Sequence, residues 1–93
     1  MMQPTLLAID CGTQSLRALL FDLSGSLLES VKVPYSPYYS EQPGWAEQDP
    51  EVFWDSLIKA CRQLRRQNGW AFQAVAGLGV TAQRDSMVCL DSR

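Results

Sequence analysis

The 93-residue sequence contains no histidine. Histidine is the usual base of a nucleophilic triad and a common zinc ligand, so a Ser-His-Asp triad and a HExxH zinc site are excluded from this chain. The sequence also lacks an excess of basic residues, because eight Lys and Arg stand against ten Asp and Glu, for a net charge of -2. This balance argues against a surface that binds nucleic acid or an anionic membrane.

Cysteine is scarce, and its spacing is not that of a metal site. Cys11, Cys61 and Cys89 are odd in number and widely separated, without the CxxC spacing of a zinc or redox site. We interpret them as reduced thiols. The opening run MMQPTLLAID lacks the basic start and cleavage site of a secretory signal, and no apolar run is long enough to span a bilayer. We therefore expect a cytoplasmic protein without a membrane partner.

Three apolar stretches at the start of the chain predict three consecutive strands. Residues 5–10 (TLLAID) form a continuous apolar run that ends in a carboxylate, as in a strand buried on both faces. Apolar residues alternate over residues 15–22 (SLRALLFD) and 27–33 (LLESVKV), which predicts two more strands joined by a turn at Gly25. We expect these strands to be antiparallel neighbours.

Residues 50–67 carry the pattern of an amphipathic helix. Asp49 is a typical N-cap, and Pro50 suits the first helical position. Asn68-Gly69 has the chemistry of a C-cap. One apolar face repeats at steps of three and four residues along Phe53, Leu57, Ala60 or Cys61, and Leu64. This spacing predicts a helix that packs one face on the sheet.

Two further apolar runs follow the helix. Residues 75–81 (VAGLGVT) predict a strand parallel to the first, because a helical crossover precedes it, and residues 86–91 (SMVCLD) predict another. The resulting order is β-β-β-α-β-β in an α/β protein with a mixed sheet. No second helix follows to cover the other face of that sheet, and an exposed apolar face is costly. We therefore expect the chain to be a truncated portion of a longer protein.

The segment from Asp10 to Arg17 (DCGTQSLR) holds residue types that suit a phosphate ligand. Asp10 can hold Mg²⁺, Gly12 allows the backbone to approach a ligand, and Thr13 and Ser15 add donors. Arg17 can neutralise a phosphoryl group that is being transferred. The segment is not a Walker A loop, since it lacks GxxxxGK[ST]. On spacing alone, an ordinary hairpin turn capped by Asp10 explains these residues equally well.

Three segments together resemble a known family. AIDCGTQSLRALLFD resembles the first phosphate motif of the FGGY carbohydrate kinases, D-x-G-T-x-S-x-R followed by a strand that ends in Asp. PGWAEQDPEVFW at residues 43–54 and GLGVTAQRDSMVCLD at residues 77–91 are similar to later segments of these kinases, in family order. The resemblance implies a ribonuclease H-like, actin-like ATPase fold, in which residues 1–93 form a partial N-terminal kinase domain.

The resemblance also implies a reaction and a nucleotide site. The parent protein is expected to be an ATP-dependent phosphotransferase that acts on a hydroxyl of a small sugar or polyol. By the family pattern, Asp10 organises the Mg²⁺ of the nucleotide, and Arg17 is catalytic, near the transferred group. The residues that line the β- and γ-phosphates are Gly12, Thr13 and Ser15.

Gln83, Arg84 and Asp85 are the substrate candidates. They match the Gln-Arg-Glu of glycerol kinases, whose last two residues bind polyol hydroxyls, and Arg donors with Asp acceptors suit vicinal hydroxyls. The shorter Asp85 departs from glycerol kinases, and xylulose kinases use a different pair here, so the sugar is left open. Without the resemblance, an Arg-Asp pair after a strand is an ordinary surface ion pair.

Several parts of a kinase are not expected in these residues. By the family pattern, the catalytic base is an Asp further along the chain, so we expect the isolated 93-residue chain to be inactive. Two alternatives stay open: a non-catalytic polyol- or phosphate-binding or structural remnant of the fold, and an actin-like or chaperone-type ATPase. The second alternative shares Asp10 to Arg17 but should lack the PGWAEQDP and QRD segments. The sequence leaves a homo-oligomer open.

Overall fold

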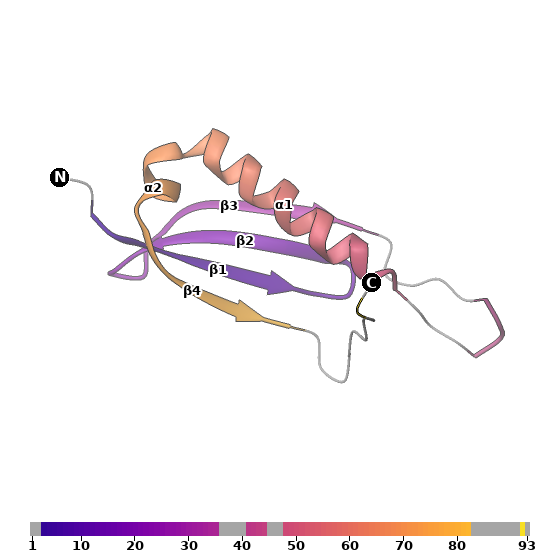
Figure 1. Cartoon of the computed structure of the whole chain (residues 1–93). Helices are drawn as coiled ribbons and strands as arrows, with labels where there is room; N and C mark the ends of the chain where they lie inside the picture. Colours follow the sequence, from indigo (N-terminus) through magenta and orange to yellow (C-terminus); the bar gives the residue numbers. More distant parts are fainter. Residues whose placement is uncertain (1–2, 36–40, 45–47, 83–91, 93) are drawn as a thin grey trace.

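The computed structural model describes residues 3–35, 41–44, 48–82 and 92. The described residues form a four-stranded sheet with two helices (Figure 1). The elements, in chain order, are β1 (Thr5–Cys11), β2 (Ser15–Asp22), β3 (Leu27–Pro34), α1 (Pro50–Gln67), α2 (Gly69–Gln73) and β4 (Val75–Thr81).

The strand order β3-β2-β1-β4 places β1 in the interior of the sheet. β1 is antiparallel to β2, with Asp10 opposite Arg17, and parallel to β4, with Asp10 opposite Thr81. The parallel pairing follows from the crossover through α1, as the sequence predicts. Three residues from three different strands therefore share one row across the sheet.

The core lies between α1 and the sheet. Alternation along β2 turns Leu16, Ala18 and Leu20 towards α1, and all three are buried. Val31 and Val33 of β3 lie on the same side of the sheet. The buried residues of α1 that face the sheet are Ser56, Ala60 and Leu64. α1 begins as its sequence predicts, because the Asp49 carboxylate accepts a hydrogen bond of 3.0 Å from the Glu51 N–H.

The structure differs from the sequence prediction after α1. Asn68 ends α1, but its side chain also accepts a hydrogen bond from the Ala71 N–H, so it caps a second short helix. Gly69 is therefore the first residue of α2 and not part of a C-cap that ends the helical region. The buried Thr5 hydroxyl donates to the Ala71 carbonyl at 2.6 Å and ties α2 to β1. The strand predicted at residues 86–91 lies outside the described residues and stays a prediction.

The sheet face that points away from α1 carries an apolar area that is not covered by any described helix. A groove on this face is lined in part by Leu6, Ala8, Phe21, Gly77 and Gly79. Leu6 is 42% exposed, which is unusual for a leucine in an interior strand. This open face agrees with the expectation that the chain is a portion of a larger protein.

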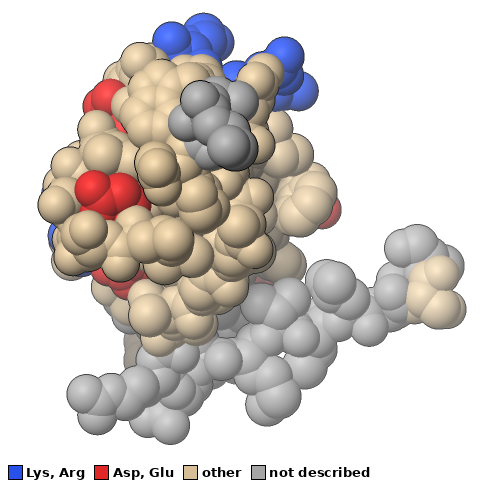
Figure 2. Space-filling view, turned by 90° about the vertical axis from the view of Figure 1, so that its left-hand side faces the viewer, with Lys and Arg blue, Asp and Glu red and all other residues tan. Residues whose placement is uncertain are grey.

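Charge is distributed unevenly over the surface. In Figure 2, which views the molecule from the left-hand side of Figure 1, Lys and Arg gather at the top and most of the face is uncharged. The last turn of α1 carries Arg65 and Arg66, and positive charges at this end of a helix interact favourably with the helix dipole. Neither described helix is both long and apolar enough to cross a membrane.

Candidate functional site

The candidate site lies at the hairpin between β1 and β2. In Figure 1 this hairpin is at the end of the sheet where β4 ends and α1 begins. The Gly12 N–H donates to the Ser15 carbonyl at 2.9 Å, which closes the turn. A Cβ atom added at Gly12 would lie 3.2 Å from the Ser15 carbonyl oxygen, tighter than most such contacts. The close turn therefore favours glycine at this position.

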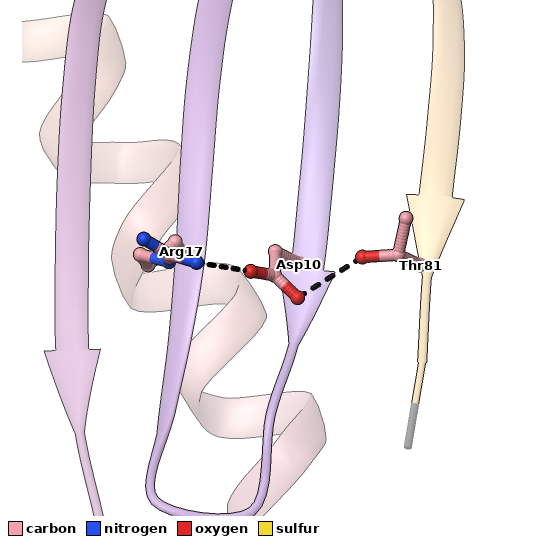
Figure 3. A network of polar contacts seen from close by, with 3 residues as sticks. All are labelled: Asp10, Arg17 and Thr81. Atoms are coloured by element: carbon pink, nitrogen blue, oxygen red, sulfur yellow. Dashed lines mark hydrogen bonds and ion pairs between the residues drawn. The ribbon is translucent and has the colours of Figure 1, made fainter. Parts of the chain in front are cut away.

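Asp10, Arg17 and Thr81 form a row of polar contacts beside the hairpin (Figure 3). The Arg17 guanidinium donates to one carboxylate oxygen of Asp10 at 2.6 Å, and the Thr81 hydroxyl donates to the other at 3.0 Å. Asp10 belongs to β1, Arg17 to β2 and Thr81 to β4, and the three side chains meet because their positions are in register. The Arg17 and Asp10 side chains are 56% and 39% exposed, so a ligand can reach the pair.

The environment of Asp10 favours its ionised form. The hydrogen bond from Arg17 and, next, that from Thr81 lower the pKa of Asp10 below its ordinary value. A lowered pKa contributes stability that is present above the ordinary carboxyl pKa and is lost as the pH falls through the lowered value. Asp10 is therefore a carboxylate at neutral pH and is available as a cation ligand.

The donor set fits a Mg²⁺–phosphate ligand better than a metal cage. Within the described residues, there is no group of three or more His, Cys, Asp or Glu side chains that could hold a metal ion. Mg²⁺ is commonly bound through one or two carboxylates, with water and substrate phosphates as the other ligands. Asp10 can supply that single carboxylate, and the neighbouring hairpin carries backbone N–H groups and the hydroxyls of Thr13 and Ser15, which are donors of the kind that bind phosphate.

Three residues at the site were not identified from the sequence: Thr81, Tyr35 and Gln48. Thr81 contacts Asp10. The Tyr35 hydroxyl donates to the Gly12 carbonyl, and the Gln48 side-chain amide donates to the Thr13 carbonyl at 2.8 Å. Thr81 has a sequence signal, as the polar end of an apolar run, whereas the two hairpin contacts depend on where the chain between β3 and α1 returns.

The residues that the sequence predicts to bind the nucleotide phosphates and Mg²⁺ lie together in the structure. Asp10, Gly12, Thr13, Ser15 and Arg17 all belong to one hairpin and the two strand ends beside it. The predicted substrate residues, Gln83, Arg84 and Asp85, lie outside the described residues.

The chain matches a known protein family over nearly all of its length. Residues 5–93 match the family described as "FGGY family of carbohydrate kinases, N-terminal domain". A glycerol kinase of Marinomonas sp. (strain MWYL1) is 38% identical over 86 residues, which is 92% of this chain and 17% of that protein. This chain therefore spans about a sixth of the length of that relative.

Solved structures of sugar kinases share the fold. A xylulose kinase from Rhodospirillum rubrum superimposes with a TM-score of 0.85 at 30% identity, over 95% of this chain and 18% of that one. A gluconate kinase from Lactobacillus acidophilus gives a TM-score of 0.72 at 25% identity, over 86% and 15% of the two chains. The mixed sheet with its helices is therefore that of sugar kinase N-terminal domains.

Proposed function

This chain belongs to the FGGY family of carbohydrate kinases, and from that premise we propose that it forms the nucleotide-phosphate site of a kinase that phosphorylates a small sugar or polyol. The phosphate donor is ATP, bound with Mg²⁺, and the acceptor is an alcohol group of the substrate. The observation that carries the proposal is the junction of the Asp10–Arg17–Thr81 row with the tight hairpin at Gly12.

Each residue of the hairpin has a distinct role in this proposal. Asp10 holds Mg²⁺, directly or through its water, and Mg²⁺ when bound neutralises charge on the β- and γ-phosphates. Gly12 brings the backbone close to the phosphates, and the hydroxyls of Thr13 and Ser15 donate to their oxygens. Arg17 stabilises the negative charge of the phosphoryl group during transfer.

The Asp10–Arg17 ion pair has a specific consequence for ligand binding. In the structure, the Arg17 guanidinium occupies one of the two carboxylate oxygens of Asp10. A cation bound at this carboxylate would compete with the guanidinium for its negative charge. Nucleotide binding is therefore expected to release Arg17 from Asp10 and make its donors available to a phosphate.

The sugar side of the reaction is assigned to Gln83, Arg84 and Asp85. These residues come shortly after β4, whose last residue, Thr81, contacts Asp10. A guanidinium fork and a carboxylate can bind neighbouring hydroxyls of one substrate molecule. The catalytic base is expected further along the polypeptide of a full-length kinase. We place this kinase in the cytoplasm, where thiols such as Cys11 and Cys61, both free in the structure, stay reduced.

A substrate panel tests the proposed function. The longest in-frame product of the gene should show saturable, Mg²⁺-dependent ATP turnover with one sugar or polyol of a panel that includes glycerol, xylulose and gluconate. Arg84→Ala and Asp85→Ala should each lower kcat/KM for that substrate by about 10²- to 10³-fold, because truncation leaves substrate hydroxyls unpaired. The KM for MgATP should stay within about twofold, since the phosphate site is intact.

Arg62→Ala and Asp55→Ala are matched controls on the exposed side of α1 and should leave turnover unchanged. Absence of turnover with every compound would contradict the kinase proposal and favour a non-catalytic binding module. An equal loss in the α1 controls would remove Arg84 and Asp85 from the substrate site.

A further inference from the structure

The three successive carbonyl groups of the β1–β2 hairpin are all hydrogen-bonded by donors from outside it. The Gly12 carbonyl accepts from the Tyr35 hydroxyl, and the Thr13 carbonyl accepts from the Gln48 amide at 2.8 Å. The Gln14 carbonyl accepts from the Tyr35 backbone N–H at 2.9 Å. Two residues, one directly after β3 and one shortly before α1, therefore orient every peptide group between Gly12 and Ser15.

This orientation determines where the hairpin N–H groups point. In a trans peptide, the carbonyl of one residue and the N–H of the next point in opposite directions, and the described chain has no cis peptide. Carbonyls directed at the donors of Tyr35 and Gln48 therefore turn the N–H groups of Thr13, Gln14 and Ser15 away from these donors. A phosphate is attracted by N–H groups and repelled by carbonyl oxygens, so this is the arrangement that an anion site needs.

The two donors are themselves held in place by the surrounding fold. The Tyr35 ring packs edge-to-face on Phe53 of α1, with ring centroids 5.6 Å apart and an interplanar angle of 86°. Burial, followed by the contact with Cys11, raises the pKa of the Tyr35 phenol, which therefore keeps its proton at neutral pH. Gln48 directly precedes Asp49, the N-cap of α1. The start of α1 thus anchors both contacts with the hairpin.

We propose that Tyr35 and Gln48 are positioning residues that hold the Gly12–Ser15 hairpin in its phosphate-binding orientation. This inference rests on the proposed function, because it assigns the same hairpin to the nucleotide phosphates. Neither residue needs to touch the nucleotide. Their effect on phosphate affinity is transmitted through the Gly12 and Thr13 carbonyls.

The test measures phosphate recognition separately from folding and from the rest of the nucleotide. Tyr35→Phe removes the hydroxyl donor but keeps the ring on Phe53, and Gln48→Met removes the amide donor with little change in size or charge. Each variant is made in the longest in-frame product of the gene, and its Kd values for MgADP and for adenosine are measured by calorimetry. Gln67→Met, at the exposed far end of α1, is the matched control.

We expect each variant to raise the Kd for MgADP about tenfold, the cost of one lost hydrogen bond, and to leave the Kd for adenosine within about twofold. Gln67→Met should change neither value. Thermal unfolding identifies a variant that does not fold. If Gln48→Met fails this check, Tyr35→Phe decides, because its ring packing is retained.

Each of the other outcomes overturns the inference in a recognisable way. If the unmodified protein binds MgADP and the variants bind it equally well, the hairpin does not depend on these donors. The proposed function would then stand without this inference. An equal loss of MgADP and adenosine affinity would indicate a general structural role. Failure of the unmodified protein to bind MgADP would instead overturn the proposed function together with the inference.

Discussion

Replacing Asp10 with Asn is expected to lower kcat of the longest in-frame product by about 10²- to 10³-fold, the usual cost of removing one preorganised electrostatic group. The amide is almost the same size and can still accept the Thr81 hydrogen bond, so the fold should be retained. It lacks the negative charge that attracts Mg²⁺ and pairs with Arg17. The measurement is kcat as a function of Mg²⁺ concentration, and half-maximal activation should require more Mg²⁺ in the variant.

Asp55→Asn, on the exposed side of α1, is the control for Asp10→Asn. It removes an exposed carboxylate of the same type that makes no contact with the hairpin in the described structure, and it should leave both kcat and the Mg²⁺ requirement unchanged. Full activity of Asp10→Asn, with an unaltered Mg²⁺ dependence, would show that Asp10 does not organise the metal. In that case the hairpin would be an ordinary turn whose carboxylate serves only the surface ion pair with Arg17.

Arg17→Met should also produce a large loss, about 10³-fold in kcat, at the low end of the effect of an arginine that stabilises phosphoryl transfer. Methionine keeps much of the aliphatic length of arginine but cannot donate to a phosphate or to Asp10. Binding of MgADP should change much less than kcat, because the assigned role of Arg17 is at the transferred group. Arg62→Met provides a control on the exposed surface of α1.

The pH dependence gives Arg17→Met a second signature. Arg17 is the main cause of the lowered pKa of Asp10, so its removal lets this pKa rise towards the ordinary carboxyl value. Asp10 must be ionised to hold Mg²⁺, and the acid limb of the kcat/KM profile for MgATP should therefore move to higher pH in the variant. An acid limb at the same pH as in the unmodified protein would indicate that activity does not depend on Asp10 ionisation.

The strands and the long helix could be predicted because each carries its own periodic signal. Alternation in β2 separates Arg17 from the buried Leu16 and Ala18, and the Asp49-Pro50 pair marks the start of α1. α2 was missed, since five residues (GWAFQ) are too short for a helical period to be recognised. Its start depends on a second role for Asn68, which the sequence suggests only as the end of the preceding helix.

The candidate site was predictable in its local part and not in its long-range part. Asp10, Gly12, Thr13, Ser15 and Arg17 lie within eight positions of one another, so a single hairpin brings them together. The contact with Thr81 depends on the parallel register of β1 and β4, which spans 71 positions. The contacts made by Tyr35 and Gln48 depend on tertiary packing at the start of α1, which local patterns do not specify.

The central claim is that the Gly12–Ser15 hairpin and Asp10 hold the phosphates and Mg²⁺ of a nucleotide. A crystal structure of the longest in-frame product with MgADP tests it most directly. We expect diphosphate oxygens within hydrogen-bond distance of the hairpin N–H groups, and Mg²⁺ or one of its waters on the Asp10 carboxylate. A diphosphate bound elsewhere, with the Asp10–Arg17 pair and the hairpin unchanged and unliganded, would show that this hairpin is not the phosphate site.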